Sequence, residues 1–381
     1  MGVEKMIPFN KPSIKETEKE HMAQAIANLK LCGDGAYTKK VYEIFGEKLG
    51  ISNMLLTTSC SHALDMTAIL AGFQEGDEVI APSYTFVSTI NAFALRGAKP
   101  VFCDVEKETM NMDADKIEEL ITPRTKAIYP VHYAGVLCDM DKINAIAQKH
   151  NLLVIEDAAQ AVGSFYKGTR PAGTIGDMGC FSFHETKNYV MGEGGAIVVK
   201  DGELFKKAEI IREKGTDRSQ FIRGEVDKYT WKMVGSSFLP SDVLAAILYG
   251  QMERFDAIMD ARMRVWDSYY EGLADLEKEG RLIRPYIPEY STHNAHMFYI
   301  ILPTKEIRDN MITTLRERGI QSVFHYIPLH TSPMGKEFGC DGRRLPVTEE
   351  YAGRLLRLPM YAGLTDSDVA MIIETVKDVL S

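Results

Sequence analysis

The residues with the clearest chemical potential lie in one stretch, residues 152–199. An apolar run there ends in an acid, Asp157, and Lys187 is the only lysine between positions 168 and 199. A glycine turn, Gly192–Gly195, then leads into another apolar run. An acid and a lysine on opposite sides of one site suit a pyridine-ring cofactor whose aldehyde is carried on the lysine. Asp157 could equally cap the next helix, and Lys187 could be an ordinary loop lysine.

A second group of residues could bind a phosphate. Ser59-Cys60-Ser61 separates a short apolar run from a helical pattern. The free N–H groups at a helix start and the serine hydroxyls favour an anion there. Ser182 offers another hydroxyl near Lys187. Simpler explanations exist, because a serine often caps its own helix and a strand serine can be satisfied by its neighbours.

Two more side chains could contact the ring of such a cofactor. Phe86 follows a predicted strand and could stack on a planar ring, although an isolated phenylalanine more often lies in the core. Gln160 could donate to a ring hydroxyl, although its position alone is unremarkable. We expect no metal site, because His184-Glu185 lacks the second histidine of a zinc motif. No GxSxG, Walker or GxGxxG motif is present.

The pattern of apolar runs predicts the elements that position these residues. Short, continuous apolar runs alternate with helical patterns, which is typical of a mostly parallel sheet covered by helices on both faces. Ligands of such α/β sheets lie at the carboxyl ends of the strands, where the candidate residues fall. The predicted strands are 54–58, 78–82, 100–105, 126–132, 152–156, 179–183 and 195–199.

The pattern changes in the last third of the chain. A long helical region over 241–279 is followed by a strand at 296–302, a helix over 308–319 and a strand at 321–326. Two helices, 346–357 and 366–380, end the chain. Because 381 residues are too many for one simple core, we expect two domains. The large one, residues 1–250, would bind the cofactor, and the smaller α+β domain would comprise residues 251–381.

Bulk composition is ordinary for a globular enzyme, with 45% hydrophobic and 25% charged residues. A net charge of −9 argues against a nucleic-acid partner, although a local basic pocket could still bind a small anion. No apolar run approaches the ~18 residues needed to cross a bilayer. The N-terminal residues 1–9 lack a signal-peptide segment, and the six cysteines form no CxxC pair. These features predict a cytoplasmic protein with reduced thiols and no membrane partner.

Several motifs together are more specific than any single residue. TTSCSHAL, PSYTFVST, VHYAG, EDAAQA, SFHETKN with GEGG, and FHYIPLH occur in this order along nearly the whole chain. They resemble the DegT/DnrJ/EryC1/StrS family of nucleotide-sugar aminotransferases, which have the fold of the type I transferases that depend on pyridoxal 5′-phosphate. The resemblance implies that Lys187 is the catalytic residue and carries this cofactor, with pyridoxamine 5′-phosphate formed between two half-reactions.

The resemblance also implies a set of cofactor contacts. Asp157 would pair with the pyridine nitrogen, Gln160 would contact the ring oxygen, and Phe86 would stack on the ring. The phosphate would be held by Ser182 and by the backbone at Cys60 and Ser61.

Three positions depart from the usual family pattern. Cys60 stands where the family has glycine, which requires that the backbone there does not need a positive φ. Ser237 stands where the partner subunit often supplies an asparagine to the cofactor phosphate. Arg212-Glu213-Lys214-Gly215 replaces the usual Arg-x-His-Gly.

Within the family, SCS, HETKNY, IREKGTDRSQF, VDKYTW and GSS are similar to the dTDP-4-amino-4,6-dideoxygalactose transaminases of cell-surface polysaccharide synthesis. This similarity implies dTDP-4-keto-6-deoxyglucose as the acceptor, L-glutamate as the donor, and a homodimer with active sites at the subunit interface. The alternatives are another nucleotide-sugar aminotransferase, which would make the 4-amino-glucose epimer or aminate C3, a sugar dehydratase, or a non-catalytic member of the fold. Lys187 argues against the dehydratases that carry histidine at this position.

A basic loop after Lys214 is a candidate binding site for the diphosphate of the sugar nucleotide. By family analogy its side chains could reach the site of the neighbouring subunit, although a solvated surface loop explains any one of them equally well. His325 and Tyr326, at the end of a predicted strand, are candidates for sugar contact. The basic candidates are Arg218, Arg223 and Lys228.

Overall fold

The computed structural model describes residues 6–340 and 342–381. The expectation that residues 1–9 hold no signal peptide falls mostly on residues 1–5, which lie outside these ranges. Among the described residues, no helix is both long and apolar enough to span a bilayer.

A seven-stranded sheet forms the centre of the molecule, in the order β1-β9-β8-β5-β4-β2-β3. All seven predicted strands are present, and five neighbouring strands from β8 to β3 pair in parallel. β9 runs antiparallel to both β8 and β1. The sheet is therefore mostly parallel, as predicted. The strands are β1 (Met54–Thr57), β2 (Glu78–Pro82), β3 (Lys99–Cys103), β4 (Thr125–Ile128), β5 (Leu153–Asp157), β8 (Met178–Ser182) and β9 (Gly195–Val199).

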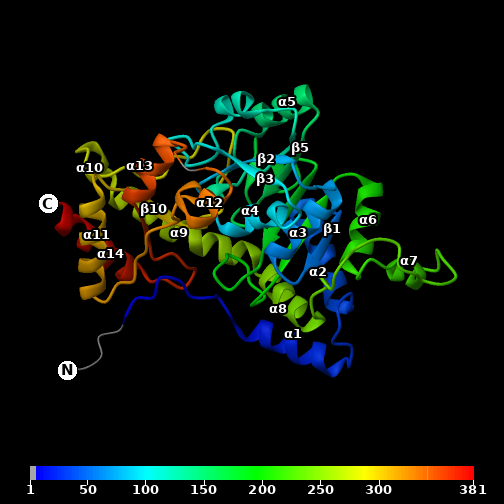
Figure 1. Cartoon of the computed structure of the whole chain (residues 1–381). Coiled ribbons are helices and arrows are strands. Elements are labelled where there is room, and N and C mark those ends of the chain that lie inside the picture. The colour runs from blue at the N-terminus through cyan, green and yellow to red at the C-terminus, as the bar shows by residue number, and fades with distance from the viewer. Residues whose placement is uncertain (1–5, 341) are drawn as a thin grey trace.

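Helices cover both faces of this sheet (Figure 1). On one face, α2, α5 and α8 share a core with Leu56 and Ile80. On the other, α3, α4 and α6 pack with Leu55 and Val79. Successive strand residues point to opposite faces, so a strand covered on both sides is apolar over most of its length. The bounds are α2 (Ala36–Leu49), α3 (Cys60–Ala71), α4 (Val87–Ala94), α5 (Met140–His150), α6 (Gly202–Arg212) and α8 (Asp242–Glu253).

Short elements fill the connections of this large unit. The sequence pattern over 113–121 predicts a helix, but these residues form two 3-10 turns, η1 and η2. The Asp113 side chain caps the first turn by accepting from the N–H of Asp115. The short helix α7 lies on a segment that projects from the body of the molecule (Figure 1). These elements are α1 (Glu16–Ala27), η1 (Ala114–Lys116), η2 (Glu118–Leu120), η3 (Tyr133–Gly135), β6 (Phe165–Tyr166), β7 (Arg170–Pro171) and α7 (Arg218–Ile222).

The C-terminal part packs helices α9, α11 and α14 around a two-stranded sheet of β10 and β11. Its elements are α9 (Phe255–Gly272), α10 (Ala274–Lys278), β10 (Phe298–Ile301), α11 (Lys305–Glu317), η4 (Leu329–Thr331), α12 (Pro333–Glu337), α13 (Pro346–Arg354), β11 (Leu355–Leu358) and α14 (Asp366–Leu380).

Two predictions for this part were wrong. Residues 321–326 form no strand of a sheet and contribute only a bridge from Val323 to Arg357. The helix predicted over 346–357 ends at Arg354, and Leu355–Leu358 form β11, antiparallel to β10. The reason is tertiary, because a four-residue apolar run fits a helix or a strand until a neighbouring strand offers hydrogen bonds.

The apolar cores overlap the predicted domain boundary. Phe255 belongs to the core of the central sheet, whereas Val265, on the same helix, belongs to the C-terminal core. Ile7 also lies in the C-terminal core and pairs with Ile320, so the N-terminal segment passes along the C-terminal part before it reaches α1 (Figure 1). Apart from these two segments, we propose that the chain divides into a large domain, residues 1–250, and a small domain, residues 251–381. Helix α9 contributes to the cores of both.

Candidate active site

A cavity of about 520 Å³ opens where the carboxyl ends of the parallel strands meet. The structure brings most of the candidate residues together there, from the large unit and from the C-terminal part. Those that line the cavity are Cys60, Ser61, Phe86, Asp157, Gln160, Ser182, Lys187, His325 and Tyr326.

Four candidates lie elsewhere. Arg218 donates to Glu213 at 3.2 Å, and Arg223 donates to Glu209 at 2.7 Å, so both are engaged in surface ion pairs. Within one chain, none of the four lines the cavity, so a role at a cofactor site requires a second copy of the chain. The four are Ser237, Arg218, Arg223 and Lys228.

Lys187 lies in the connection between β8 and β9, and its neighbour Asn188 fixes this connection. The Asn188 side chain donates to the carbonyl of Asn294 at 2.7 Å. Its oxygen lies 2.9 Å from Nδ1 of His296. An amide oxygen only accepts, so His296 carries its proton on Nδ1. Sequence reasoning missed Asn188, because nothing local in the sequence shows that its side chain reaches the C-terminal part.

The surroundings of Lys187 lower the pKa of its amine. Burial lowers the pKa of Lys187, and the charge of Arg357 lowers it further, while Cys60 and Asp157 oppose the shift. Burial also lowers the pKa of His296 and of His325, so both imidazoles remain neutral near pH 7. A neutral lysine amine can attack an aldehyde, whereas an ammonium cannot.

The pH dependence of cofactor capture follows from this lowered pKa. Below its pKa the Lys187 amine is protonated and unreactive, so we expect covalent capture of pyridoxal 5′-phosphate by the apoprotein to speed up as pH rises through that pKa. The midpoint should lie below the ordinary value for lysine. Absorbance changes on mixing apoprotein and cofactor across a pH series measure it. A midpoint at the ordinary value would contradict the burial argument.

Asp157 ends β5 and its side chain is almost fully buried at the cavity wall. Oδ2 accepts from the Thr89 hydroxyl at 2.7 Å, and Oδ1 accepts from the N–H of Ala159 at 3.1 Å. The Thr89 hydroxyl also lies 2.9 Å from that of Thr85. These bonds hold the carboxylate in one orientation beside the cavity. Sequence reasoning missed Thr89, because nothing local in the sequence shows that α4 packs beside the end of β5.

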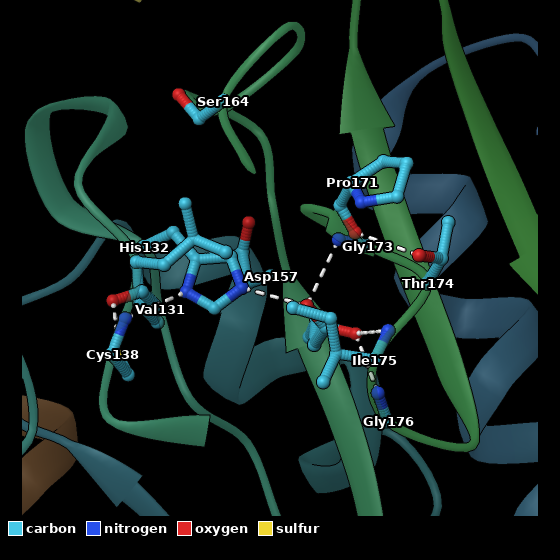
Figure 2. A network of polar contacts seen from close by, with 12 residues as sticks. Val131, His132, Cys138, Asp157, Ser164, Pro171, Gly173, Thr174, Ile175 and Gly176 are labelled. Atoms are coloured by element: carbon cyan, nitrogen blue, oxygen red, sulfur yellow. Dashed lines mark hydrogen bonds and ion pairs between the residues drawn. The ribbon is translucent and has the colours of Figure 1, made fainter. Parts of the chain in front are cut away.

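Glu156, the residue before Asp157, anchors the other side of β5. Its carboxylate is fully buried and accepts from His132 Nε2 at 2.8 Å (Figure 2). His132 Nδ1 accepts from the N–H of Cys138 at 3.2 Å, so the proton of a neutral His132 is on Nε2. Three backbone N–H groups complete the shell, those of Gly173, Ile175 and Gly176, at 2.9, 2.6 and 2.7 Å.

Replacing Glu156 with glutamine is expected to destabilise the fold. A glutamine amide group would face N–H donors that now meet a carboxylate, and leaving such groups unsatisfied costs about 2 kcal/mol. Urea unfolding measures the difference. Glu185→Gln, at an exposed position, is the control and should leave the free energy of unfolding unchanged. Equal stabilities of the two variants would show that the buried network does not anchor β5.

The start of α3 forms a cradle at the cavity. Ser59 caps the helix by accepting from the N–H of His62, and Cys60 is the first helical residue. Cys60 is not among the residues with positive φ, as its side chain requires. Ser61 hydrogen-bonds to Ser88 at 2.7 Å. The first N–H groups of a helix have no partner inside it, so they are available to an anion.

The glycine turn brings β9 against this cradle. Gly192 has a φ of +86°, which favours glycine. A Cβ on Gly195 would lie 2.4 Å from the backbone nitrogen of Cys60, so no side chain fits between β9 and the start of α3. The turn therefore shapes the cradle through its backbone alone.

Gly195→Ala is expected to push β9 away from α3. Overpacking of this kind costs about 1–3 kcal/mol, and the displaced N–H groups should bind the cofactor phosphate more weakly. Thermal unfolding and titration of the apoprotein with pyridoxal 5′-phosphate measure both effects. Gly202→Ala is the matched control, because a Cβ there meets nothing within 4 Å. If both variants bind the cofactor as the unaltered protein does, the close approach is unimportant.

The cavity wall opposite the start of α3 is formed by residues from both the large unit and the C-terminal part. Gln160 accepts from the N–H of Ala134 at 2.7 Å and donates to the Tyr326 hydroxyl at 3.2 Å. His325 stacks on Tyr326 with 3.5 Å between ring centroids. Phe86 is 56% exposed and faces the cavity, so it is not a core residue.

The chain is similar to known proteins along nearly its whole length. A model of the DegT/DnrJ/EryC1/StrS aminotransferase family matches residues 12–377. The chain belongs to this family. It is 35% identical to the GDP-perosamine synthase of Caulobacter vibrioides over 373 residues, which cover 97% of each chain.

Solved structures of the family have the same fold. The aminotransferase TlmJ from Streptoalloteichus hindustanus has a TM-score of 0.90 and 33% identity, covering 98% of this chain and 99% of that one. The putative sugar aminotransferase Spr1654 of Streptococcus pneumoniae, in its PMP form, has a TM-score of 0.90 and 27% identity, covering 98% of each chain. The predicted family, fold class and cofactor are confirmed: this is a sugar aminotransferase of fold type I that uses pyridoxal 5′-phosphate.

The residues of the cavity fit this cofactor. The cradle at α3 offers N–H and hydroxyl donors to a phosphate, Asp157 offers a fixed carboxylate to a ring nitrogen, and Lys187 offers an amine to the aldehyde. Among the described residues, no three His, Cys, Asp or Glu side chains are grouped as metal ligands would be.

Proposed function

We propose that the protein transfers the amino group of L-glutamate to C4 of dTDP-4-keto-6-deoxy-D-glucose. The products would be dTDP-4-amino-4,6-dideoxy-D-galactose and 2-oxoglutarate. The observation that carries the transaminase assignment is the meeting of Lys187 and Asp157 in one cavity with a phosphate cradle. The dTDP-sugar is supported by the segments SCS, HETKNY and VDKYTW, which are similar to those of the transaminases of that sugar.

In this proposal each residue has a role toward the cofactor. Pyridoxal 5′-phosphate supplies an electron sink that stabilises a carbanion at the substrate carbon. Asp157 would keep the ring nitrogen protonated, and Gln160 and Phe86 would orient the ring. Lys187 would carry the cofactor through its amine, which would also take a proton from the donor Cα as base and return one as acid. The phosphate contacts would come from Cys60, Ser61 and Ser182.

We propose a homodimer with active sites at the subunit interface. The segment that carries α7 projects from the body (Figure 1) and exposes large apolar side chains, among them Trp231, which is 76% exposed. Exposed apolar groups of this kind mark interaction surfaces. Insertion of this segment into a second copy would bring its basic residues to the neighbouring cavity, where they would hold the sugar-nucleotide diphosphate. The basic residues are Arg218, Arg223 and Lys228. Ser237 would lie near the cofactor phosphate of the neighbouring cavity, and His325 and Tyr326 would contact the sugar.

We also propose a cytoplasmic location, where the reduced cysteines would persist. All six cysteines are unpaired in the structure, and Cys103, Cys138 and Cys180 are buried in the large unit. Thiols without disulfides are typical of the cytosol.

A second acceptor deserves equal testing, because the Caulobacter relative is a GDP-perosamine synthase. A GDP-linked 4-keto-6-deoxy sugar would meet the same cofactor chemistry. Whether the enzyme accepts the dTDP-sugar or the GDP-sugar depends on the pocket that binds the nucleotide. The 4-amino-glucose epimer and amination at C3 are further outcomes within the same reaction class.

Incubation with L-glutamate and each keto-sugar tests the proposal. We expect stoichiometric 2-oxoglutarate with the dTDP-sugar and an axial amine at C4 in the product, read by NMR. Preference for the GDP-sugar, or an equatorial amine, would overturn the substrate or the product assignment, respectively. If no 2-oxoglutarate forms with the dTDP-sugar or with the GDP-sugar, L-glutamate is not the donor.

A further inference from the structure

The segment of residues 130–135, which follows β4, contacts both of the polar residues proposed to meet the cofactor ring. The N–H of His132 donates to the Asp157 carbonyl at 3.1 Å. Two residues further on, the N–H of Ala134 donates to the Gln160 side chain at 2.7 Å. Asp157 and Gln160 therefore both lie against the backbone of a single segment.

Little regular secondary structure holds this segment in shape. β4 ends at Ile128, and the sheet continues there as an isolated bridge from Val131 to Asp157. Ala134 has a φ of +58°, a left-handed conformation that residues with a Cβ rarely adopt. Such a conformation persists only where the surrounding contacts impose it. The segment therefore needs an anchor outside its own backbone.

The side chain of His132 supplies this anchor (Figure 2). It is fully buried, its Nε2 donates to the Glu156 carboxylate at 2.8 Å, and its Nδ1 accepts from the N–H of Cys138 at 3.2 Å. Glu156 and Asp157 are neighbours on β5, so His132 holds this pair at two points, through its ring and through its backbone N–H. Two bonds to adjacent residues fix both the position and the orientation of the segment at the end of β5.

His132 acts on the cavity through these neighbours. Its ring does not line the cavity, whereas the adjacent Val131 does. Both ring nitrogens are used within the protein, one as donor and one as acceptor, so the imidazole has none left for substrate or cofactor. An apolar side chain of similar size would fill the same space but would make neither bond. Packing therefore requires only the volume of His132, whereas orientation of the segment requires its two hydrogen bonds.

We propose that His132 is a positioning residue that orients the Asp157 carboxylate and the Gln160 amide toward the cofactor ring. It does so through residues 130–135, which its imidazole joins to Glu156. The inference rests on the roles proposed above for Asp157 and Gln160 in transamination and adds the residue that aligns them. Alignment matters because a displacement of about 1 Å at a catalytic group costs on the order of 10²-fold in rate.

The first test is His132→Phe in the holoenzyme, which keeps most of the side-chain volume and removes both hydrogen bonds. We expect kcat with L-glutamate to fall roughly 10- to 100-fold, because Asp157 and Gln160 lose their alignment with the ring. His150→Phe is the matched control. His150 also lies 2.8 Å from a glutamate, Glu118, but this pair is at the surface and away from the cavity, so kcat should not change.

The absorbance of the bound cofactor gives a readout that does not depend on turnover. A positive ring nitrogen disfavours a proton on the nitrogen that joins Lys187 to the cofactor. Weaker support from Asp157 in His132→Phe should therefore move the pH midpoint of this absorbance upward. A purely structural role of His132 would lower Tm and leave the midpoint in place. His132→Gln, which still donates to Glu156 but offers no acceptor to Cys138, should give a smaller shift.

A double-mutant cycle shows whether His132 acts through Asp157. If it does, His132→Phe added to Asp157→Asn should lower kcat by far less than the same change in the unaltered protein, because the two effects are coupled. Additive losses would show that His132 acts independently of Asp157 and would overturn the inference.

An unchanged midpoint in a folded His132→Phe also overturns the inference, and it leaves the proposed function standing. If His132→Phe does not fold, His132→Gln takes its place, and an unchanged midpoint in that variant overturns the inference. If L-glutamate does not convert the unaltered holoenzyme, the proposed function fails, while the midpoint still decides the role of His132.

Discussion

Replacing Lys187 with alanine is expected to give a folded protein that binds pyridoxamine 5′-phosphate but does not turn over. The variant lacks the amine that carries the cofactor and the group that moves the proton to and from the donor Cα. Proton transfer by a positioned group contributes up to about 10⁴-fold, so kcat should fall on the order of 10⁴-fold or more. Release of 2-oxoglutarate over many turnovers measures this loss.

Lys200→Ala is the matched control for Lys187. It lies just beyond β9, is exposed and does not line the cavity. This variant should keep both the covalent cofactor and full activity. Bound pyridoxamine 5′-phosphate in Lys187→Ala, seen by its absorbance, would show that the cavity has not collapsed. Normal turnover by Lys187→Ala would refute the assignment of the catalytic lysine.

Asp157→Asn is expected to fold and to retain cofactor, yet to react slowly. The amide has nearly the shape of the carboxylate, and its oxygen can still accept from the Thr89 hydroxyl, which bonds Asp157 at 2.7 Å. It carries no charge to stabilise a protonated ring nitrogen, so the electron sink weakens. Loss of one preorganised electrostatic partner costs roughly 10²- to 10³-fold in kcat. Single-turnover absorbance with L-glutamate isolates this step.

Asp177→Asn tests whether any nearby acid has the same effect. Asp177 accepts from the N–H of Val154 at 2.8 Å, near the opposite end of β5, and lies outside the cavity. This change should alter stability without altering kcat. Full activity of Asp157→Asn would refute the proposed role of Asp157. An equal loss of kcat in Asp177→Asn would show that the loss comes from a disturbed β5 and not from a missing charge at the cavity.

Much of the site could be predicted because strand ends are visible in the sequence. Ser61, Phe86 and Asp157 each follow or end an apolar run, and parallel strands bring their carboxyl ends to one edge. The residues that were missed act through contacts between parts distant in sequence. Thr89 reaches Asp157 from α4, and Asn188 reaches the C-terminal part.

The sequence by itself determined the strands of the central sheet, the family and the glycine turn beside Lys187, since each is specified by local composition and spacing. Tertiary structure decided the rest. The direction of β9 and the change of residues 355–358 from predicted helix to β11 depend on which strand lies alongside. The exclusion of Arg218 and Arg223 from the cavity and the inclusion of Arg357 depend on where whole segments pack. Backbone pairing and burial act across the chain, and no local pattern encodes them.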